Sequence, residues 1–270
     1  MDAALAPDGG CPPSTAAKLR GKAQWALCLG RVGRAALQPL TRRQYATAPD
    51  DGDAAALESW PLCPDLRSSL LCIRALMAGA LPDVEIRLGV DDHPPVVVMS
   101  DAMWRPSRDE PLIGFGRVAY LVWVPLLTGG GKLAYAEADA PREMLMAFAA
   151  LRAKSQYICD LEEVALAAPY FSEALADSLR GQQVIHFADN VAANCGAIGG
   201  GSSSPTMGRI IHALHMRWAF ERVNPWIEFV KSEANLADDP SRGDMTWAEG
   251  LGAVPIEFVF PPCGGWDDSM

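Results

Sequence analysis

Val96-Val97-Val98-Met99-Ser100-Asp101 is a short, uninterrupted apolar run that ends in an acid. A run of this kind is typical of a β-strand that is buried on both faces of a sheet. A longer apolar stretch follows at residues 113–123, and a third short one at residues 132–136. Together the three stretches predict an antiparallel meander of three strands.

The chain after this meander alternates between helical and strand patterns. Two further short strands are predicted at residues 184–188 and 226–230. Helical patterns occupy residues 142–153, 160–179 and 207–222, and a last one begins at residue 234. This order indicates a mixed α/β fold, with a five-stranded sheet of three antiparallel and two parallel strands flanked by helices.

The whole chain divides into four predicted segments. Residues 1–13 are rich in proline, glycine and alanine, so we expect them to be disordered. Residues 14–90 predict a small helical module and residues 91–246 predict the α/β domain. Residues 247–270 remain as a C-terminal tail.

The net charge of −10 is unusual for a protein that binds nucleic acid, because phosphate contacts depend on lysine and arginine. The charge is unevenly spread, however. No acid occurs between Gly9 and Pro49, a stretch that holds seven basic residues: Lys18, Arg20, Lys22, Arg31, Arg34, Arg42 and Arg43. Subtracting these leaves the remainder with a net charge of −17. This asymmetry favours nucleic-acid contact by the helical module, although a plain solvated face explains it equally well.

Several protein classes are disfavoured by the sequence. The seven cysteines are scattered and include no C-x-x-C pair, which argues against a disulfide framework and against a zinc site. Residues 1–10 lack the features of a secretory signal. The longest apolar run, Val118 to Leu127, is too short to span a bilayer and contains Pro125. We therefore expect an intracellular protein, cytoplasmic or nuclear, that is neither secreted nor membrane-bound.

Four acids stand where predicted elements begin or end. Asp101 ends the first strand and Asp189 ends the fourth, so neighbouring strands would bring both to one edge of the sheet. Glu162 lies in the helix that follows the meander, and Asp238 lies at the start of the last helix. Crowded carboxylates repel one another and raise one another's pKa, and two Mg²⁺ ions would neutralise the cluster. Two metal ions held about 3.5–4 Å apart support an in-line displacement at a phosphoryl group.

The motifs around these acids resemble the ribonuclease H domain of retroelement (retrotransposon) reverse transcriptases. The resemblance covers roughly residues 95–245 and rests on four strings: Ser100-Asp101-Ala102, Leu161-Glu162-x-x-Ala165, Phe187-Ala-Asp189-Asn190-x-Ala192 and Asn235-x-Ala-Asp238-x-Pro-Ser-Arg242. Each string alone is weak, but four in the right order are fairly specific. The resemblance implies a ribonuclease H-like fold whose carboxylates Asp101, Glu162, Asp189 and Asp238 are both catalytic and metal-binding.

The activity that this resemblance implies is two-metal-ion hydrolysis of the RNA strand of an RNA–DNA hybrid, with Mg²⁺ as cofactor and Mn²⁺ as the alternative. Asp101 and Asp189 would bridge or flank the ions. Glu162 would hold the ion nearer the 2′-hydroxyl, and Asp238 the ion that shapes the attacking water. Recognition would depend on hybrid shape and 2′-hydroxyls. The candidate nucleic-acid contacts are Lys18, Arg20, Lys22, Arg31, Arg34, Trp104, Arg105 and Asn190.

The N-terminal module carries a second resemblance. Lys18-Leu-Arg-Gly-Lys22, Gly30-Arg-Val-Gly-Arg-Ala-Ala-Leu37 and Pro39-Leu40 are similar to the segment that connects a reverse transcriptase to its ribonuclease H. The chain would then be the tail of a retrotransposon polyprotein or a derivative of one. A polymerase domain, on the same or another chain, would be its partner.

Several alternatives stay open at the sequence level. The acids are doubled at Glu162/Glu163 and at Asp238/Asp239, and helix facing decides between them. His212 and His215, which lie in a predicted helix, are the candidates for a family histidine that assists product release. The domain could instead be a catalytically silent nucleic-acid-binding or interaction module, or a nuclease of the same fold that cuts DNA.

Overall fold

The computed structural model describes residues 1–6, 9–27, 32–46, 60–80, 93–110, 113–151 and 158–263. It comprises two compact units. The first contains Met1–Asp83, Gly200–Met216 and Pro262–Met270, and the second contains Val84–Gly199 and Arg217–Pro261. The boundary between them falls inside helix α10 (Pro205–Phe220), so the segment after Gly199 belongs with the N-terminal helices.

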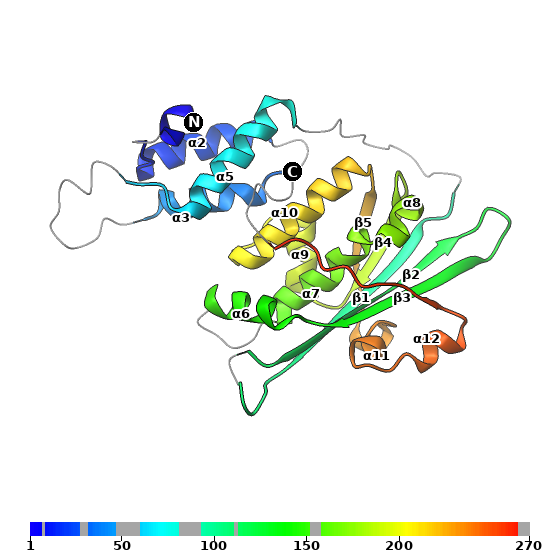
Figure 1. The fold of residues 1–270 in the computed structure, drawn as a ribbon. Helices are drawn as coiled ribbons and strands as arrows, with labels where there is room; N and C mark the ends of the chain where they lie inside the picture. Colours follow the sequence, from blue (N-terminus) through cyan, green and yellow to red (C-terminus); the bar gives the residue numbers. More distant parts are fainter. Residues whose placement is uncertain are drawn as a thin grey trace. The chain divides into compact units, whose positions relative to one another are not determined.

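The second unit is built on a mixed sheet. Its strands are β1 (Val96–Arg105), β2 (Phe115–Pro125), β3 (Gly131–Asp139), β4 (Gln183–Ala188), β5 (Asn224–Phe229) and β6 (Val254–Pro255). They are arranged in the order β5-β4-β1-β2-β3-β6 (Figure 1). β1, β2 and β3 form an antiparallel meander, while β4 runs parallel to β1 and β5 runs parallel to β4. This strand order confirms the predicted mixed α/β fold, with its three-stranded antiparallel meander and two parallel strands.

The structure adds a sixth strand to the five that the sequence predicts. β6 pairs with β3 in parallel, through Ala134↔Val254 and Tyr135↔Pro255. It lies in the segment predicted as a C-terminal tail, and the backbone N–H of Ile256 extends the pairing by donating to the Tyr135 carbonyl at 2.9 Å. Two paired residues are too few to produce a strand pattern in the sequence.

Helix α7 (Ile158–Ala167) packs closely on β1 and β2. All of its residues from Asp160 to Ala167 are buried. Gly116 on β2 permits the approach, because a Cβ at this position would lie only 2.6 Å from Leu161 Cδ1. The predicted helix over residues 160–179 is therefore too long: α7 ends at Ala167, and a 3₁₀ turn with Pro169 follows, since proline lacks the N–H that a helix interior needs.

The remaining helices of this unit cover both faces of the sheet. α6 (Arg142–Leu151), α8 (Ala176–Leu179) and α9 (Val191–Gly199) lie on the same side as α7, while α11 (Asp238–Ser241) and α12 (Thr246–Gly250) lie on the other (Figure 1). On this second side a small core forms from Leu121, Tyr135, Ala237, Ala248 and Ala253. It fixes the short α11 against β2.

The first unit is helical. It contains α1 (Asp2–Leu5), α2 (Pro13–Ala26), α3 (Gln38–Gln44), α5 (Pro64–Ala75) and the beginning of α10, with short irregular turns at Ala35–Leu37 and Leu76–Ala80. Residues 1–13 are predicted to be disordered, but α1 buries Ala4 and Leu5, and the Cys11 N–H donates to the Trp60 carbonyl at 3.0 Å. Two buried side chains and an isolated β-bridge between Gly10 and Pro61 are tertiary contacts that composition does not reveal.

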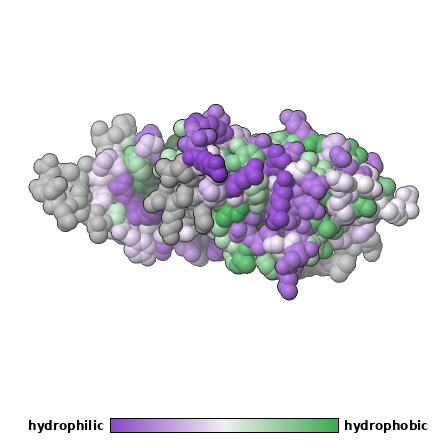
Figure 2. Space-filling model, turned by 90° about the horizontal axis from the view of Figure 1, so that it is seen from below, coloured by the Kyte–Doolittle hydropathy of each residue, from purple (hydrophilic) through white to green (hydrophobic). Residues whose placement is uncertain are grey.

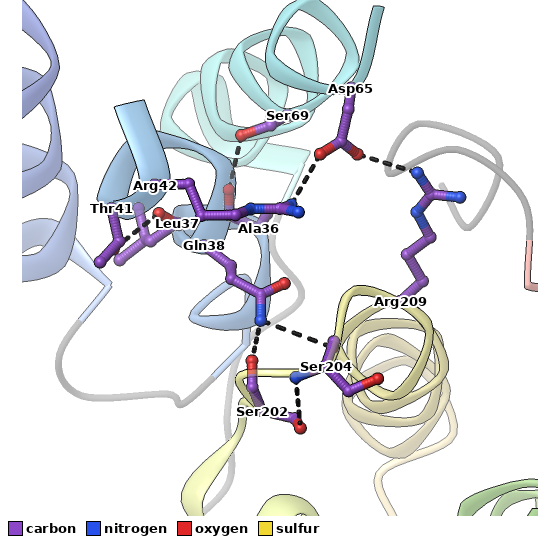
Figure 3. Close-up of polar contacts among 10 residues, drawn as sticks. All are labelled: Ala36, Leu37, Gln38, Thr41, Arg42, Asp65, Ser69, Ser202, Ser204 and Arg209. Carbon is purple, nitrogen blue, oxygen red and sulfur yellow. Dashed lines mark hydrogen bonds and ion pairs between the residues drawn. The ribbon is translucent and has the colours of Figure 1, made fainter. Parts of the chain in front are cut away.

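Polar contacts join the N-terminal helices to the segment that begins at Gly200 (Figure 3). Asp65 on α5 accepts from Arg42 on α3 at 2.7 Å and from Arg209 on α10 at 2.9 Å. The Gln38 side-chain amide donates to the backbone carbonyl of Ser202. These contacts explain why residues 200–216 group with the first unit.

None of the described helices combines the length and the apolar character required to cross a membrane. On the face drawn in Figure 2, hydrophobic patches are scattered among hydrophilic residues. Isolated exposed hydrophobics are ordinary on protein surfaces.

Candidate metal centre

Three of the four predicted acids meet at one end of the sheet. Asp101 on β1, Glu162 on α7 and Asp189 directly after β4 each offer a carboxylate oxygen, and these oxygens lie within 4.8 Å of one another. Asp101 and Glu162 are buried and Asp189 is half-buried. Asp101 was predicted to end the first strand, but β1 continues to Arg105, so Asp101 lies inside it. The parallel pairing of β1 with β4, through Val98↔His186 and Met99↔Phe187, brings Asp101 level with Asp189, which follows the end of β4.

Burial dominates the charge state of Asp101, whose side chain is only 4% exposed. Its pKa is raised to about 7, mainly by loss of solvation and also by the negative charges of Asp189 and Asp238, while the Ser241 hydroxyl opposes the shift. A carboxyl whose ordinary pKa is 3.8 is thus half protonated near neutral pH in the absence of a cation.

The structure distinguishes Glu162 from its neighbour Glu163. Burial raises the pKa of Glu162, and the charges of Asp101 and Asp189 add to the shift, so its carboxyl faces the cluster. Glu163 is fully buried, neither of its oxygens has a hydrogen-bond partner among the described residues, and burial followed by the charge of Asp160 raises its pKa. Of the doubled pair, only the first belongs to the cluster.

Asp238 lies beside the cluster rather than within it. It is close enough to raise the pKa of Asp101, yet it is not one of the three acids whose oxygens converge. Its carboxylate forms an ion pair with Arg242, one helical turn later, at 2.7 Å. Asp239 is exposed, so the first acid of this pair again faces the site.

A buried polar chain supports the β1–β4 junction next to the cluster. His186 on β4 bonds Ser100 on β1 through Nε2 at 2.8 Å and Tyr170 through Nδ1 at 3.1 Å. Burial lowers the pKa of His186 to about 3, so the ring is neutral and donates through one nitrogen only. Successive strand residues point to opposite faces, so Ser100 anchors the strand on the side away from Asp101.

The donor set of the cluster fits a hard divalent cation. All three groups are carboxylates, which Mg²⁺ prefers over nitrogen and sulfur ligands. Glu162 Oε2 is buried and has no hydrogen-bond partner among the described residues. Burial first, and then repulsion from the neighbouring acids, raises the pKa of Asp101 and of Glu162, and a bound cation would offset both effects.

The other predicted contact residues are placed as follows. Trp104 is half-buried and its indole N–H donates to the Ile113 carbonyl at 3.1 Å, while Arg105 is exposed with its guanidinium 4.9 Å from the Phe115 ring. Asn190 caps α9, because its side-chain oxygen accepts the N–H groups of Ala192 and Ala193. These three belong to the second unit.

The basic candidates lie in the first unit. Lys18, Lys22 and Arg34 are exposed and Arg20 is half-buried, whereas Arg31 lies outside the described residues. His212 and His215 are buried, and His212 Nε2 lies 3.4 Å from Cys72 Sγ within the same unit. Because both histidines are buried, we assign them a structural role.

Three residues near the acids had no assigned role in the sequence. Ser232 donates a hydrogen bond to Asp189, Asn235 donates to Asp101, and Ser241 donates to the backbone carbonyl of Asp238. Asn235 and Ser241 are part of the Asn-x-Ala-Asp-x-Pro-Ser-Arg string, so the motif contained a signal for them. Ser232 had none.

No protein-family model and no curated protein matches the chain. Among solved structures, RNase H1 from the halophilic archaeon Halobacterium salinarum NRC-1 is similar to this chain with 16% sequence identity and a TM-score of 0.34. The match covers 52% of this chain and 88% of the RNase H1 chain. LC9-RNase H1, a type 1 RNase H with the type 2 active-site motif, is similar with 14% sequence identity and a TM-score of 0.35. The match covers 66% of this chain and 82% of the LC9-RNase H1 chain.

Proposed function

We propose that this chain is a metal-dependent endonuclease that hydrolyses the RNA strand of RNA–DNA hybrids. The observation that carries the proposal is the convergence of carboxylate oxygens from Asp101, Glu162 and Asp189 within 4.8 Å at one end of the sheet. Three carboxylates so close together are unfavourable unless a cation or protons neutralise them. A nuclease of this type needs such a group and no protein nucleophile.

Asp101, Glu162 and Asp189 would hold the divalent metal, Mg²⁺ or Mn²⁺, with Asp238 beside them. When bound, two such ions supply an activated water and stabilise the leaving oxygen of the phosphodiester. Asp101 and Glu162 release their protons on loading, because only the charged carboxylates are ligands. The Ser100–His186 bond holds β1 on β4, which keeps Asp101 and Asp189 together.

The substrate side of the proposal rests on the motifs and the charge distribution. The exposed Lys18 and Lys22 are suited to backbone phosphates, and Arg105 is exposed in the unit that carries the acids. The retroelement-like motifs support an origin as the tail of a retrotransposon polyprotein, with a polymerase domain as partner.

The test is cleavage of a labelled RNA–DNA hybrid by the full chain in Mg²⁺, with duplex DNA as a comparison substrate. Asp189→Asn keeps the shape of the side chain but removes its charge, so we expect cleavage to fall by about 100-fold or more. Asp177→Asn is the matched control, because this side chain is 99% exposed in the same unit and should leave cleavage unchanged.

Equal cleavage by wild type and Asp189→Asn would contradict the proposal. Hybrid binding without turnover in either Mg²⁺ or Mn²⁺ would identify a catalytically silent module. Preferential cleavage of duplex DNA would identify a DNA nuclease of the same fold.

A further inference from the structure

The buried side chain of Asn235 connects two segments that carry acids. It is 4% exposed, and its amide nitrogen donates to the Ser100 carbonyl at 3.0 Å and to Asp101 Oδ1 at 3.4 Å. Its amide oxygen accepts the Ala237 N–H at 3.2 Å, one residue before Asp238. All hydrogen-bonding groups of this amide are thus directed at Asp101, its strand, or the segment of Asp238.

Ser241 makes the complementary contact from the other end of α11. It is fully buried, its hydroxyl donates to the Asp238 carbonyl at 2.9 Å, and it lies near enough to the Asp101 carboxyl to influence its pKa. Asn235 and Ser241 therefore flank Asp238 in sequence; the first bonds Asp101 and the second bonds the Asp238 backbone.

The segment needs such anchors because it has little structure of its own. α11 is four residues long, and a helix of one turn is not stable by itself. Residues 231–234, 236 and 239 are exposed, so the apolar packing of the segment is limited to Ala237, in the small core, and Pro240. Hydrogen bonds from Asn235 join the start of the segment to Asp101 and its strand, and the Ser241 hydroxyl closes the single turn that carries Asp238.

We propose that Asn235 and Ser241 are positioning residues for the candidate metal centre, holding the Asp101 carboxyl and the Asp238 segment in one arrangement. This inference rests on the proposed function, because it assigns these residues a task at that same site. A carboxylate that accepts hydrogen bonds from fixed donors is already oriented when a cation arrives. Loss of such partners typically weakens metal binding by about 10–100-fold.

The experiment measures Mn²⁺ binding to the metal-free full chain by calorimetry, together with the Mn²⁺ dependence of hybrid cleavage. Asn235→Asp keeps the shape of the side chain but replaces the donor with an acceptor facing Asp101. Ser241→Ala removes only the hydroxyl. We expect each variant to raise the Mn²⁺ dissociation constant about tenfold or more, with an unchanged KM for hybrid at saturating Mn²⁺.

Ser69→Ala is the matched control. Ser69 is also fully buried and donates to a backbone carbonyl, that of Ala36 at 2.6 Å, but it lies in the first unit. It should lose stability as Ser241→Ala does and keep wild-type Mn²⁺ binding. If Asn235→Asp misfolds, Ser241→Ala alone decides the question.

Wild-type Mn²⁺ affinity in Asn235→Asp and Ser241→Ala would overturn the positioning role while leaving the nuclease proposal intact. An equal loss in Ser69→Ala would also overturn it, because general destabilisation would then explain the effect. Weakened Mn²⁺ binding in the two variants, with no hybrid cleavage by any form, would sustain the positioning role and remove the nuclease function.

Discussion

At the scale of single residues, burial sets the charge of the acids at the candidate metal centre. Asp101 has its pKa raised to about 7, first by burial and then by Asp189 and Asp238. A shift of one pKa unit corresponds to about 1.4 kcal/mol, so the charged form of Asp101 costs the metal-free fold on the order of a few kcal/mol. Asp101, a candidate metal ligand, therefore destabilises the fold when no metal is bound.

The sign of the resulting pH dependence follows from the direction of the shift. The folded pKa of Asp101 lies above its ordinary value of 3.8, so the folded state binds more protons between about pH 4 and pH 7. The stability that protonated Asp101 provides is present at low pH and is lost as the pH rises through that window. His186 acts in the opposite sense, because its pKa is lowered to about 3 and stability is lost as the pH falls below about 6.5.

We therefore predict that Asp101→Asn stabilises the metal-free protein at pH 8 by on the order of a few kcal/mol and changes it little at pH 4. Urea unfolding in the presence of a chelator, at both pH values, measures the difference. His186 is common to both proteins, so its contribution cancels. A difference that does not change with pH would contradict the prediction, and Mg²⁺ at pH 8 should stabilise wild type alone.

At the scale of elements, the site depends on how the elements begin and end. β4 ends at Ala188, Asp189 follows, and Asn190 caps α9 through the N–H groups of Ala192 and Ala193, at 3.0 and 3.1 Å. Such caps satisfy amides that a helix leaves without partners. The cap fixes the turn in which Asp189 stands.

We predict that Asn190→Ala lowers the free energy of unfolding by about 1 kcal/mol, whereas Asn190→Asp retains most of it, since aspartate is an equally good cap. Chemical denaturation measures both variants. The KM for hybrid separates the cap from the predicted nucleic-acid contact. A capping role alone leaves the KM of Asn190→Ala unchanged, and a raised KM would support the contact.

At the scale of the whole molecule, the division into units does not follow the chain. Gly200–Met216 belongs with Met1–Asp83, although the sequence between Asp189 and Asp238 reads as one continuous domain. The contacts of Asp65 with Arg42 and Arg209 are part of what holds this segment (Figure 3). The segment that links the third and fourth acids is thus partly organised by the N-terminal helices.

We predict that Asp65→Ala increases amide hydrogen exchange in residues 205–216 and lowers the free energy of unfolding by about 1 kcal/mol, because both ion pairs are partly solvent-exposed. Asp2→Ala is the control, since its ion pair with Arg74 is more exposed and 3.4 Å long. Exchange in 205–216 that matches wild type would show that apolar packing alone holds the segment.

Much of the second unit and its chemistry could be predicted from the sequence. The apolar run Val96–Met99 indicated a buried strand, and Asp189 was correctly expected at the end of β4, whereas Asp101 lies inside β1, which continues to Arg105. These are local properties, because side-chain period and strand-end chemistry depend on neighbours along the chain. The order of the elements then implied the mixed sheet.

The tertiary structure alone decided the rest. It separated Glu162 from Glu163, placed Asp238 beside the converging acids rather than among them, and assigned residues 200–216 to the N-terminal helices. It also brought the Asn235 amide to the Asp101 carboxyl. Each of these outcomes depends on which distant residues become neighbours, and burial and electrostatic repulsion act through space rather than along the chain.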